Sequence, residues 1–477
     1  MKTMHFTNSW HENSGGVATF YRALIKEANR RQQQIRLVVP AAQDRIEEVG
    51  EFGRIYHVQA PPTPFNSDYR AIYPSQFLFR GSKLQEILIA ERPDLVEISD
   101  KYTLNYLGIL LRLRLMPAVD FRPIVVGNSQ ERMDDNVGVY LESLPFARRF
   151  CSIYMKWLYF PFFDHHIANS EYTAAELKPA AQGQLVPRGT WIRSMGVDLA
   201  HLSPQRRSAG LRRRLLQNFG ASEESVLLLY AGRLAPEKNL PLLFNLLAHL
   251  GKDRDRDYRL LVVGDGIERS QWEQKCSREM QGRAFFLGHI KDKNVLADLY
   301  ANCDVFVHPN PREPFGIAPL EAMASGLPLV APNIGGVSSY ANLENAWTVN
   351  GDVISFAEAI QEITTNRQLL IEKTRKALAI AERYRWEIVA ASFLDFYESL
   401  GGMIEASPGP LPGAAFYSTS AAGLQAAIFN GVSQLGATGF RLAARFAREP
   451  RSRPRPRVTE NPMASSNKVT ATGPLRS

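Results

Sequence analysis

The sequence has few cysteines and no hydrophobic run long enough to cross a membrane. Its three cysteines lie far apart, at Cys151, Cys276 and Cys303, and this spacing predicts neither a disulfide framework nor a metal-ligand cluster. The most apolar long segment, residues 150–163, has 14 residues and includes a lysine and a proline, whereas a membrane-spanning helix needs about 20 apolar residues. The N-terminal residues also lack the apolar core of a signal peptide. We therefore expect a cytoplasmic protein.

Positive charge is concentrated at the C-terminal end of the chain. The net charge is +8, and residues 401–477 contribute +6 of it, with 9 Lys and Arg against 3 Asp and Glu. The preceding 400 residues carry only +2. Because the basic character belongs mainly to this tail, it does not indicate a nucleic-acid-binding body, and we expect no specific nucleic-acid binding.

The length of the chain and its alternating strand and helix patterns indicate two α/β domains. A single hydrophobic core rarely grows beyond about 250–300 residues, and this chain has 477. Strands are predicted at residues 4–8, 35–40, 55–58, 95–99, 124–127, 165–170, 226–231, 260–263, 284–287, 305–308 and 327–330. Helices are predicted at residues 17–31, 270–280, 293–301, 317–325 and 385–400. This alternation favours doubly wound parallel sheets.

Residues 305–330 combine two strand patterns, a polar turn and a short helix. The turn contains Glu313, Phe315 and Gly316, and the helix begins at Ile317 and contains Glu321. Helix starts bind anions, and ligands of open α/β sheets lie beyond the carboxyl ends of strands. The two carboxylates can therefore accept hydrogen bonds from hydroxyls on either side of a bound anion. On spacing alone, an ordinary strand–loop–helix with two solvated glutamates remains the alternative.

The segment EPFGIAPLEAMASGLPLVAPNIGG closely resembles the paired-glutamate motif of retaining family 4 glycosyltransferases. The resemblance covers about residues 1–400 and is strongest in 226–340. It implies the GT-B fold, in which two Rossmann-like doubly wound domains face a cleft that binds a nucleotide-diphosphate sugar. It also implies that Glu313 binds hydroxyls of the transferred sugar and that Glu321 binds the ribose hydroxyls.

The resemblance also implies a domain division. Gly-Val-Asp at residues 196–198 is similar to the interdomain linker of the family, which places the boundary near residue 195. Residues 1–195 then form the N-terminal, acceptor-side domain, and residues 196–384 form the nucleotide-sugar-binding domain. The helix over residues 385–400 is expected to return to the N-terminal domain.

Two loops carry groups that suit a diphosphate. Gly15 and Gly16 lie between a predicted strand and a helix, where glycines let the backbone approach a phosphate closely. Arg233 and Lys238 lie in the loop AGRLAPEKNL, and a guanidinium and an ammonium that converge on one crevice neutralise phosphate charge. Surface cations and an ordinary Gly-Gly turn are the alternatives. The family resemblance further implies donor contacts at three residues near the base and phosphates, namely Gly264, His289 and Ile290.

Residues 127–138 depart from the family pattern. Related transferases often carry a histidine near the donor sugar in this region, and Gln130 stands at that place here, followed by Glu131 and Arg132. Glutamine can form hydrogen bonds but cannot carry a proton charge. These three residues are predicted on the acceptor or sugar side. A solvated loop, replacement of the histidine by His11, and reduced activity remain alternatives.

The expected function is retaining transfer of a hexose to a hydroxyl of a saccharide or lipid-linked acceptor, in glycolipid or cell-envelope polysaccharide synthesis. Glu313, Arg233 and Lys238 would carry catalysis by positioning the sugar and stabilising the leaving diphosphate, which itself takes the acceptor proton. We expect no metal and no cofactor besides the nucleotide-sugar co-substrate. A glycosidase would not need the paired cations. A non-catalytic nucleotide-sugar-binding subunit or regulatory homologue is the main alternative.

The tail over residues 401–477 is basic and of low complexity. Segments 405–420 and 449–477 are rich in proline, serine, glycine and arginine, which predicts disorder. Segment 421–448 has the pattern of an amphipathic helix with arginines on one face, interrupted by glycines. Two interpretations stay open: association with the anionic inner face of a membrane, or a tail without a specific partner.

Overall fold

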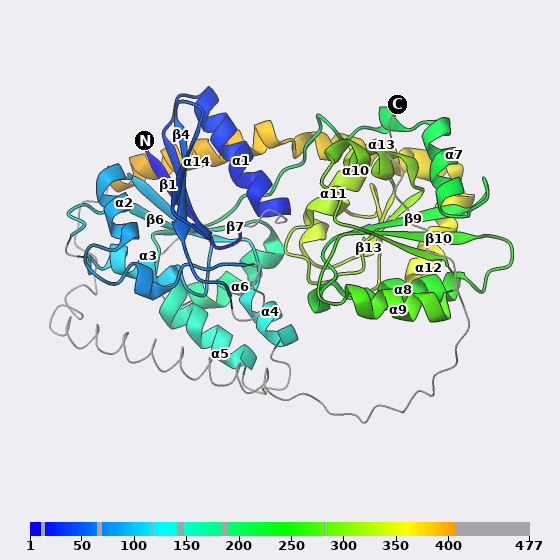
Figure 1. The fold of residues 1–477 in the computed structure, drawn as a ribbon, viewed down its shortest axis with the longest axis horizontal. Coiled ribbons are helices and arrows are strands. Elements are labelled where there is room, and N and C mark those ends of the chain that lie inside the picture. The colour runs from blue at the N-terminus through cyan, green and yellow to red at the C-terminus, as the bar shows by residue number, and fades with distance from the viewer. Residues whose placement is uncertain are drawn as a thin grey trace, which may run out of the picture. The chain divides into compact units, whose positions relative to one another are not determined.

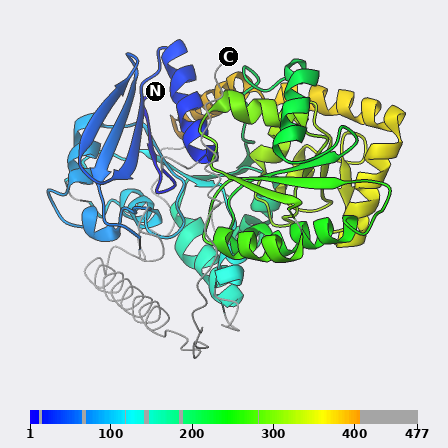
Figure 2. The same cartoon turned by 45° about the vertical axis from the view of Figure 1, so that its right-hand side comes forward.

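The computed structural model describes residues 1–10, 15–63, 69–116, 118–140, 147–182, 189–280 and 282–405. The predicted tail helix, the predicted disordered segments from residue 406 onward, and His11 lie outside these residues. Two separate sheets, one in each half of the described chain, are visible in Figures 1 and 2. None of the described helices combines the length and hydrophobicity that crossing a bilayer requires.

The first sheet has eight strands in the order β3-β4-β2-β1-β5-β6-β7-β8. The strands are β1 (Thr3–Phe6), β2 (Ile35–Ala41), β3 (Arg45–Val49), β4 (Gly53–Gln59), β5 (Leu95–Ile98), β6 (Ile124–Ser129), β7 (His165–Ala168) and β8 (Thr190–Ile192). All neighbouring pairs are parallel except β3 and β4, which form an antiparallel pair at one edge. Its central strands are fully buried because helices cover both faces, as a parallel sheet requires.

The helices of this half connect the strands. They are α1 (Gly15–Arg30), η1 (Pro74–Gln76), α2 (Lys83–Glu91), α3 (Asn105–Arg112), α4 (Met133–Tyr140), α5 (Ala147–Tyr154), η2 (Met155–Tyr159), η3 (Phe160–Phe162) and α6 (Glu171–Ala181). Element η2 is a π-helical turn that continues α5. Ser170 caps α6, and its hydroxyl accepts a hydrogen bond from the Thr173 amide at 3.1 Å.

The second sheet has six parallel strands in the order β11-β10-β9-β12-β13-β14. The strands are β9 (Val226–Ala231), β10 (Tyr258–Val263), β11 (Ala284–Gly288), β12 (Val305–Val307), β13 (Leu329–Pro332) and β14 (Trp347–Val349). Counted within this half, the order is 3-2-1-4-5-6, which is the Rossmann order. The strand order therefore reverses between β9 and β12.

The remaining helices surround the second sheet or follow it. They are η4 (Pro204–Arg206), α7 (Ala209–Asn218), η5 (Pro236–Lys238), α8 (Leu240–Leu250), α9 (Arg269–Glu279), α10 (Lys293–Asn302), α11 (Ile317–Ala324), η6 (Gly336–Ser339), α12 (Val353–Thr365), α13 (Arg367–Arg383) and α14 (Trp386–Glu405). The change from the first sheet to the second falls between Ile192 and Val226, and the predicted boundary near residue 195 lies in that interval.

Two α/β halves and their strands agree with the expected doubly wound, GT-B-like architecture. Three strands were not predicted, namely β3, β8 and β14. Strand β3 is mostly exposed and has the sequence RIEEV, so it lacks the apolar character of a buried strand. Strands β8 and β14 have three residues each, too few for a periodicity to show. Helix α14 continues to Glu405, five residues beyond the predicted end at residue 400.

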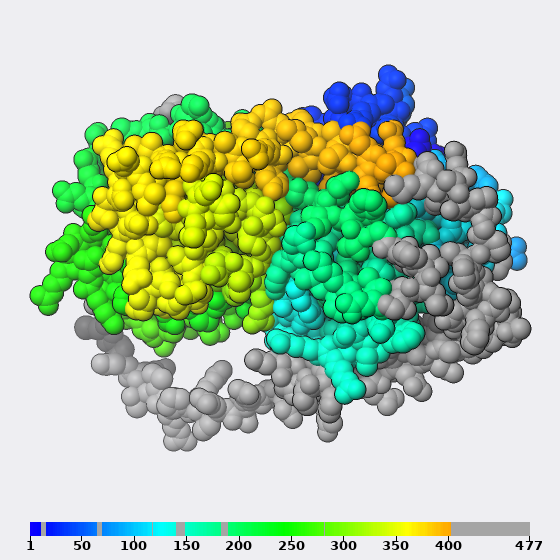
Figure 3. All heavy atoms as spheres, turned by 180° about the vertical axis from the view of Figure 1, so that it is seen from behind, coloured from blue at the N-terminus to red at the C-terminus, as the bar shows by residue number. Residues whose placement is uncertain are grey.

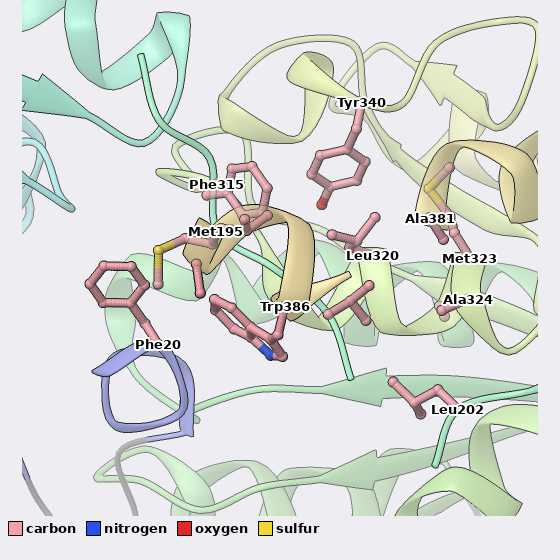
Figure 4. Close-up of a cluster of buried hydrophobic side chains, with 14 of the residues drawn as sticks. Phe20, Met195, Leu202, Phe315, Leu320, Met323, Ala324, Tyr340, Ala381 and Trp386 are labelled. Carbon is pink, nitrogen blue, oxygen red and sulfur yellow. The ribbon is translucent and has the colours of Figure 1, made fainter. Parts of the chain in front are cut away.

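Helix α14 leaves the second half of the chain and packs against α1 of the first. Figure 3 shows this helix, in orange, running along one face of the molecule. Its predicted apolar stripe is buried: Trp386, Val389, Phe393, Phe396 and Leu400 are all at most 7% exposed. Phe20 of α1 packs edge-on against Phe393 at 4.9 Å between ring centroids, and Figure 4 shows Phe20 near Trp386 and Met195 in the same cluster.

A buried carboxylate ties α14 to the first sheet. Glu97 on β5 is fully buried and accepts hydrogen bonds from the hydroxyls of Tyr21 on α1, at 3.0 Å, and of Tyr397 on α14. His5 Nδ1 on β1 lies 3.2 Å from the same carboxylate. Burial would raise the pKa of Glu97, but the nearby His5 and the hydrogen bonds hold the pKa below its usual value. Four elements therefore meet at one carboxylate.

We expect Tyr397→Phe to lower the stability of the folded chain. The substitution keeps the ring but removes one hydrogen-bond donor from a buried carboxylate, which costs about 1–3 kcal/mol. Thermal unfolding would measure the loss. Tyr384→Phe is the matched control, because the Tyr384 hydroxyl donates an exposed hydrogen bond to Ser339 O at 3.3 Å. Equal melting temperatures for the two variants would contradict the role assigned to Glu97.

Candidate functional site

The candidate site lies where β9 and β12 end, at the point where the strand order of the second sheet reverses. Ligands of open α/β sheets bind at such a point because the loops of the two central strands diverge there. The loop after β9 carries Arg233 and Lys238, and the loop after β12 carries Glu313. The fold therefore brings together cations and a carboxylate that are about 75 residues apart in the sequence, as the Lys238–Glu313 contact shows.

Lys238 and Glu313 form a largely buried ion pair. The Lys238 Nζ donates to Glu313 Oε2 at 2.8 Å, and the two side chains are 16% and 14% exposed. Asn310 Nδ2 donates to the same oxygen at 3.0 Å. Burial would raise the pKa of Glu313, but the Lys238 charge and these hydrogen bonds lower the pKa to about 2. Glu313 is therefore an ionised acceptor of hydrogen bonds at neutral pH.

The loop that carries Glu313 is fixed in place by close contacts with Gly336 and Tyr340. Gly336 donates its amide to Glu313 O at 2.6 Å, and a Cβ at Gly336 would lie 1.9 Å from Pro314 O. Tyr340 donates its hydroxyl to Gly316 O. Gly316 has φ +88, a left-handed conformation that favours glycine, and it precedes α11. The close fit fixes the position of Glu313 and of the α11 start.

Helix α11 starts four residues after Glu313, and the first backbone amides of a helix have no partner within the helix. Phe315 itself turns inward: its side chain is 2% exposed and packs on Tyr340 at 5.2 Å between ring centroids. The predicted donor contacts of Phe315, Gly316 and Ile317 would therefore involve their backbone groups. The partial positive charge of a helix N-terminus favours a phosphate at this place.

Glu321 occupies a different environment from Glu313. It lies on α11 and accepts a hydrogen bond from the Tyr300 hydroxyl at 2.8 Å. Burial raises the pKa of Glu321 to about 7, although the Tyr300 hydrogen bond acts in the opposite direction. Glu313 stays ionised because a cation accompanies it, whereas Glu321 has no comparably close cation in the described part of the chain and titrates near neutral pH.

Glycines at the ends of β9, β10 and β11 bring three backbones into contact. The Gly264 amide donates to Gly288 O at 2.8 Å, and the Gly232 amide donates to Val263 O at 3.0 Å. Gly264 has φ +127, and a Cβ there would lie 1.9 Å from Gly232 O. Only glycine fits this position. His289 directly follows Gly288 and is exposed, and Ile290 is half-buried.

Arg233 is positioned more loosely than Lys238. Its side chain is 63% exposed, and Nη2 lies 3.4 Å from Glu237 Oε1. The Tyr230 hydroxyl donates to Arg233 O at 2.9 Å and fixes the backbone of the loop. Because its contact with Glu237 is exposed, the Arg233 guanidinium can reorient toward an incoming anion at little energetic cost.

Residues of the first half also reach the Glu313 loop and α11. Ser170 at the start of α6 donates its hydroxyl to Pro314 O at 2.5 Å. A Cβ on Gly16 would lie 2.8 Å from Ile317 Cδ1, so the start of α1 is close to the start of α11. The predicted glycine loop and the predicted phosphate helix are therefore neighbours, and any larger residue at position 16 would displace Ile317.

Gln130, Glu131 and Arg132 lie just after β6, but their environments differ. Arg132 binds Asp134 through two hydrogen bonds, at 3.0 and 2.6 Å, and stacks over Tyr172. Its guanidinium is thus already engaged in contacts with nearby side chains. Glu131 accepts a hydrogen bond from Asn136 at 2.8 Å, and burial raises its pKa.

Gln130 keeps a free donor. Its Nε2 is buried and has no hydrogen-bond partner among the residues that the structure describes. Its backbone carbonyl accepts from Asn169 at 3.0 Å. Of the three predicted acceptor-side residues, Gln130 therefore has the side chain that is best placed to donate a hydrogen bond to a ligand hydroxyl oxygen.

A buried ion pair that the sequence analysis missed supports this loop. Lys101 is 1% exposed, and its Nζ donates to Glu176 Oε2 at 2.6 Å and to Glu131 O at 2.5 Å. The other oxygen of Glu176 accepts the Asp134 amide at 3.0 Å. Lys101 and Glu176 come from different loops and helices, so no local motif identifies them.

Three further residues of the site were also missed, namely Asn310, His308 and Tyr300. Asn310 precedes Glu313 by three residues in a turn, a spacing that could have indicated a side-chain contact. His308 lies 3.8 Å from Glu313, and burial lowers its pKa to about 4, so it is neutral. Tyr300 approaches Glu321 only because α10 and α11 pack together, which the sequence does not reveal.

The expectation of a metal-free site did not take account of one acidic segment, Asp253-Arg254-Asp255-Arg256-Asp257. It has the Asp-x-Asp spacing of many metal-dependent transferases, and it directly precedes β10. It therefore lies at the amino end of that strand, opposite the edge that carries Glu313. Asp257 accepts hydrogen bonds from Ser225 and Arg259 there. Within the described residues, no cluster of three or more metal-ligating side chains occurs.

Comparisons with known proteins agree with this geometry. Residues 14–190 match the family model "Glycosyltransferase Family 4", and residues 212–383 match "Glycosyl transferases group 1". The chain is 27% identical over 404 residues to a GDP-mannose-dependent alpha-(1-6)-phosphatidylinositol dimannoside mannosyltransferase of Mycobacterium tuberculosis, covering 84% of this chain and 97% of that protein.

Two further similarities support the same grouping. A GDP-mannose-dependent alpha-mannosyltransferase of M. tuberculosis is 28% identical over 368 residues, covering 76% of this chain and 86% of that protein. The structure of sucrose-phosphate synthase from Thermosynechococcus elongatus superposes with a TM-score of 0.66 at 19% identity, covering 84% of this chain and 100% of the other. At that identity the structural likeness concerns the fold alone.

The Lys238–Glu313 pair makes a prediction about stability. Lys238→Ala would leave a buried carboxylate without its cation, a loss that costs roughly 3–5 kcal/mol. Adding Glu313→Gln to Lys238→Ala removes the uncompensated charge, so we expect the double variant to recover most of the lost melting temperature. Arg213→Ala is the control, because Arg213 pairs with Glu223 at 3.3 Å on the exposed surface and should change stability by less than about 1 kcal/mol. A double variant no more stable than Lys238→Ala would refute the pairing.

Glu321 makes a prediction about pH. The folded chain holds a proton on Glu321 up to about pH 7, whereas an unfolded chain releases it near the usual pKa of about 4.3. The wild type therefore loses stability as pH rises from about 4.5 through 7, by at most about 4 kcal/mol, and no further above 7. Glu321→Gln should gain melting temperature relative to the wild type over that window. A difference independent of pH between 5 and 8 would contradict the assignment.

Proposed function

We propose that this chain, which belongs to the glycosyltransferases that combine a family 4 domain with a group 1 domain, transfers a hexose from a nucleotide-diphosphate sugar to a hydroxyl acceptor with retention of configuration. The observation that carries the proposal is the Lys238–Glu313 pair beside the α11 start. A cation, helix amides and an ionised carboxylate in one crevice match a diphosphate followed by a hydroxylated sugar.

In the proposed donor complex, the diphosphate lies between the α11 start and the loops that carry Arg233 and Lys238. An ammonium has three donors, so Lys238 can bind a phosphate oxygen and keep its contact with Glu313. The Glu313 carboxylate accepts hydrogen bonds from the transferred sugar. The diphosphate also lies against the backbone of Gly15 and Gly16 at the start of α1. Glu321 accepts hydrogen bonds from the ribose hydroxyls. His289 and Ile290 contact the base of the donor.

The chemistry follows from these charges. The bond between the anomeric carbon and the phosphate oxygen breaks, and Arg233, Lys238 and the helix amides stabilise the negative charge on the leaving diphosphate. The acceptor hydroxyl attacks from the same face, and its proton passes to the departing phosphate oxygen. Glu313 positions the sugar and forms no covalent bond. No metal and no further cofactor is part of this proposal.

The donor we propose is GDP-mannose, because two relatives aligned over most of the chain are named for it. The acceptor is a saccharide or lipid-linked hydroxyl on the side of Gln130, in glycolipid or cell-envelope polysaccharide synthesis. One of those relatives is named for a phosphatidylinositol acceptor, which supports a lipid-linked substrate. We propose a cytoplasmic location with association at the inner face of a membrane.

The second candidate function is a nucleotide-sugar-binding subunit without transferase activity. The observation that favours it is Gln130, which stands where related enzymes often carry a histidine. This alternative predicts donor binding without turnover, whereas the proposed enzyme hydrolyses its donor slowly and transfers the sugar when an acceptor is supplied.

The test measures binding and turnover separately. We expect GDP and GDP-mannose to raise the melting temperature more than UDP and UDP-glucose, and we expect the purified chain to release GDP from GDP-mannose. Lys238→Ala should lower the turnover by about 10²–10³-fold, because one phosphate-binding charge is lost. The double variant Lys238→Ala with Glu313→Gln should stay equally inactive even where its stability recovers.

Lys252→Ala is the matched control, since Lys252 is exposed in the turn after α8 and away from the site; its turnover should equal that of the wild type. Wild-type turnover in Lys238→Ala would refute the assigned role. Donor binding without hydrolysis or transfer, across a broad acceptor panel, would instead favour the regulatory subunit.

A further inference from the structure

The most apolar long segment of the sequence, residues 150–163, begins on the surface of the first half. Its first turns form α5 and the π-helical turn η2. Figure 1 shows α5 beside α4 and α6 and away from the strands of the sheet. The segment therefore does not form a buried core helix throughout, although its composition would suit one.

Four large apolar side chains of this segment are exposed. Their exposed fractions are 46% for Phe150, 52% for Ile153, 65% for Trp157 and 40% for Leu158. Elsewhere, exposed apolar side chains of this size are scattered over many elements, which is ordinary for a protein surface. In contrast, four exposed apolar side chains within nine residues form a cluster, and such a cluster indicates an interaction surface.

The π-helical turn η2 affects Leu158 most among these four side chains. In a regular α-helix, Ile153 and Trp157 already lie on the side of Phe150, whereas Leu158 would be rotated by about 80° from Phe150, toward the side of the buried Cys151. The turn η2 accommodates an extra residue, so Leu158 rotates back toward Phe150. Tyr159 faces away from this side and is fully buried.

The charged side chains that α5 and η2 themselves contribute next to this apolar face are all basic. Arg148 and Arg149 are exposed on α5, and Lys156 lies with its ammonium 5.7 Å from the centre of the Trp157 ring. Residues 147–159 contain these three basic residues and no acidic one. Aromatic and aliphatic side chains next to arginine and lysine suit the boundary between acyl chains and anionic headgroups, where the apolar part inserts and the cations bind phosphate.

Charge complementarity also decides between two occupants of this face. The predicted amphipathic segment of the chain's own tail is the other candidate. Residues 406–477 contain nine Lys and Arg and two Asp and Glu, so their charge opposes a basic border. An anionic bilayer surface complements it.

We propose that the face formed by Phe150, Ile153, Trp157 and Leu158, bordered by Arg148, Arg149 and Lys156, docks this protein on an anionic membrane surface. The proposal differs from the expectation at the sequence level, which placed membrane contact in the tail. It does not depend on the identity of the donor or acceptor, because the face lies on α5 and η2 and includes none of the site residues.

The first test measures co-sedimentation of the full-length protein with vesicles of phosphatidylcholine alone and of phosphatidylcholine mixed with phosphatidylglycerol. We expect binding to the anionic vesicles that weakens with added salt. The double variant Trp157→Ser with Leu158→Ser should bind at least about tenfold more weakly, because the inserted apolar area is lost. Ile354→Ser with Ile371→Ser is the matched control on α12 and α13, where both residues are exposed by more than half.

The second test reverses the border charge. Arg148→Glu with Arg149→Glu should weaken binding to anionic vesicles by about tenfold or more and leave any binding to neutral vesicles unchanged. Arg213→Glu with Arg214→Glu is the matched adjacent pair on α7, and it should bind as the wild type does. Melting temperature and donor hydrolysis confirm that each variant is folded.

Three outcomes would overturn the proposal. They are no binding of the wild type to anionic vesicles, wild-type binding by both α5 variants, and loss of binding only when Arg441, Arg445 and Arg448 of the tail are changed to glutamate. The last outcome would show that the tail, and not this face, makes the membrane contact. Loss of donor hydrolysis with intact vesicle binding would count against the proposed function and leave the docking face standing.

Discussion

The ion pair between Lys238 and Glu313 is the interaction on which the site depends. It joins the loops of β9 and β12 across the point where the strand order of the second sheet reverses. A largely buried, ionised carboxylate is stable there only because a cation accompanies it. In the proposed function the same cation binds the donor diphosphate. The ion pair would then hold both side chains in position before the donor binds.

The two glutamates of the motif show how environment separates chemically identical groups. Glu313, next to Lys238, has its pKa lowered to about 2, whereas burial raises the pKa of Glu321 to about 7. One is a permanent anion and the other titrates near neutral pH. This division suits the proposed site, in which one carboxylate balances charge beside a sugar. The other carboxylate gains or loses a proton according to the hydroxyls that bind it. Neither role requires a nucleophile.

Packing around the site explains how the first half contributes. Ser170 binds Pro314 O, Gly16 approaches Ile317, and α14 returns to α1 with Tyr397 bonded to the buried Glu97. Lys101 and Glu176 hold the backbone of the loop that carries Gln130. These contacts connect the loops of the first half to the sheet through buried polar groups, which are costly to break singly and therefore define one arrangement.

The sequence by itself determined the fold class, most buried strands, and the placement of Arg233, Lys238, Glu313 and Glu321 on loops and a helix of the second half. Those features follow from local periodicity, glycine positions and one long motif. The tertiary structure alone decided which charges meet: that Lys238 pairs with Glu313, that Arg132 is committed to Asp134, and that Tyr300 reaches Glu321. It also decided that residues 150–158 present an apolar face outward, which Leu158 joins because of a π-helical turn. Contacts between distant segments and a one-residue change in helical phase leave no local signal in a sequence.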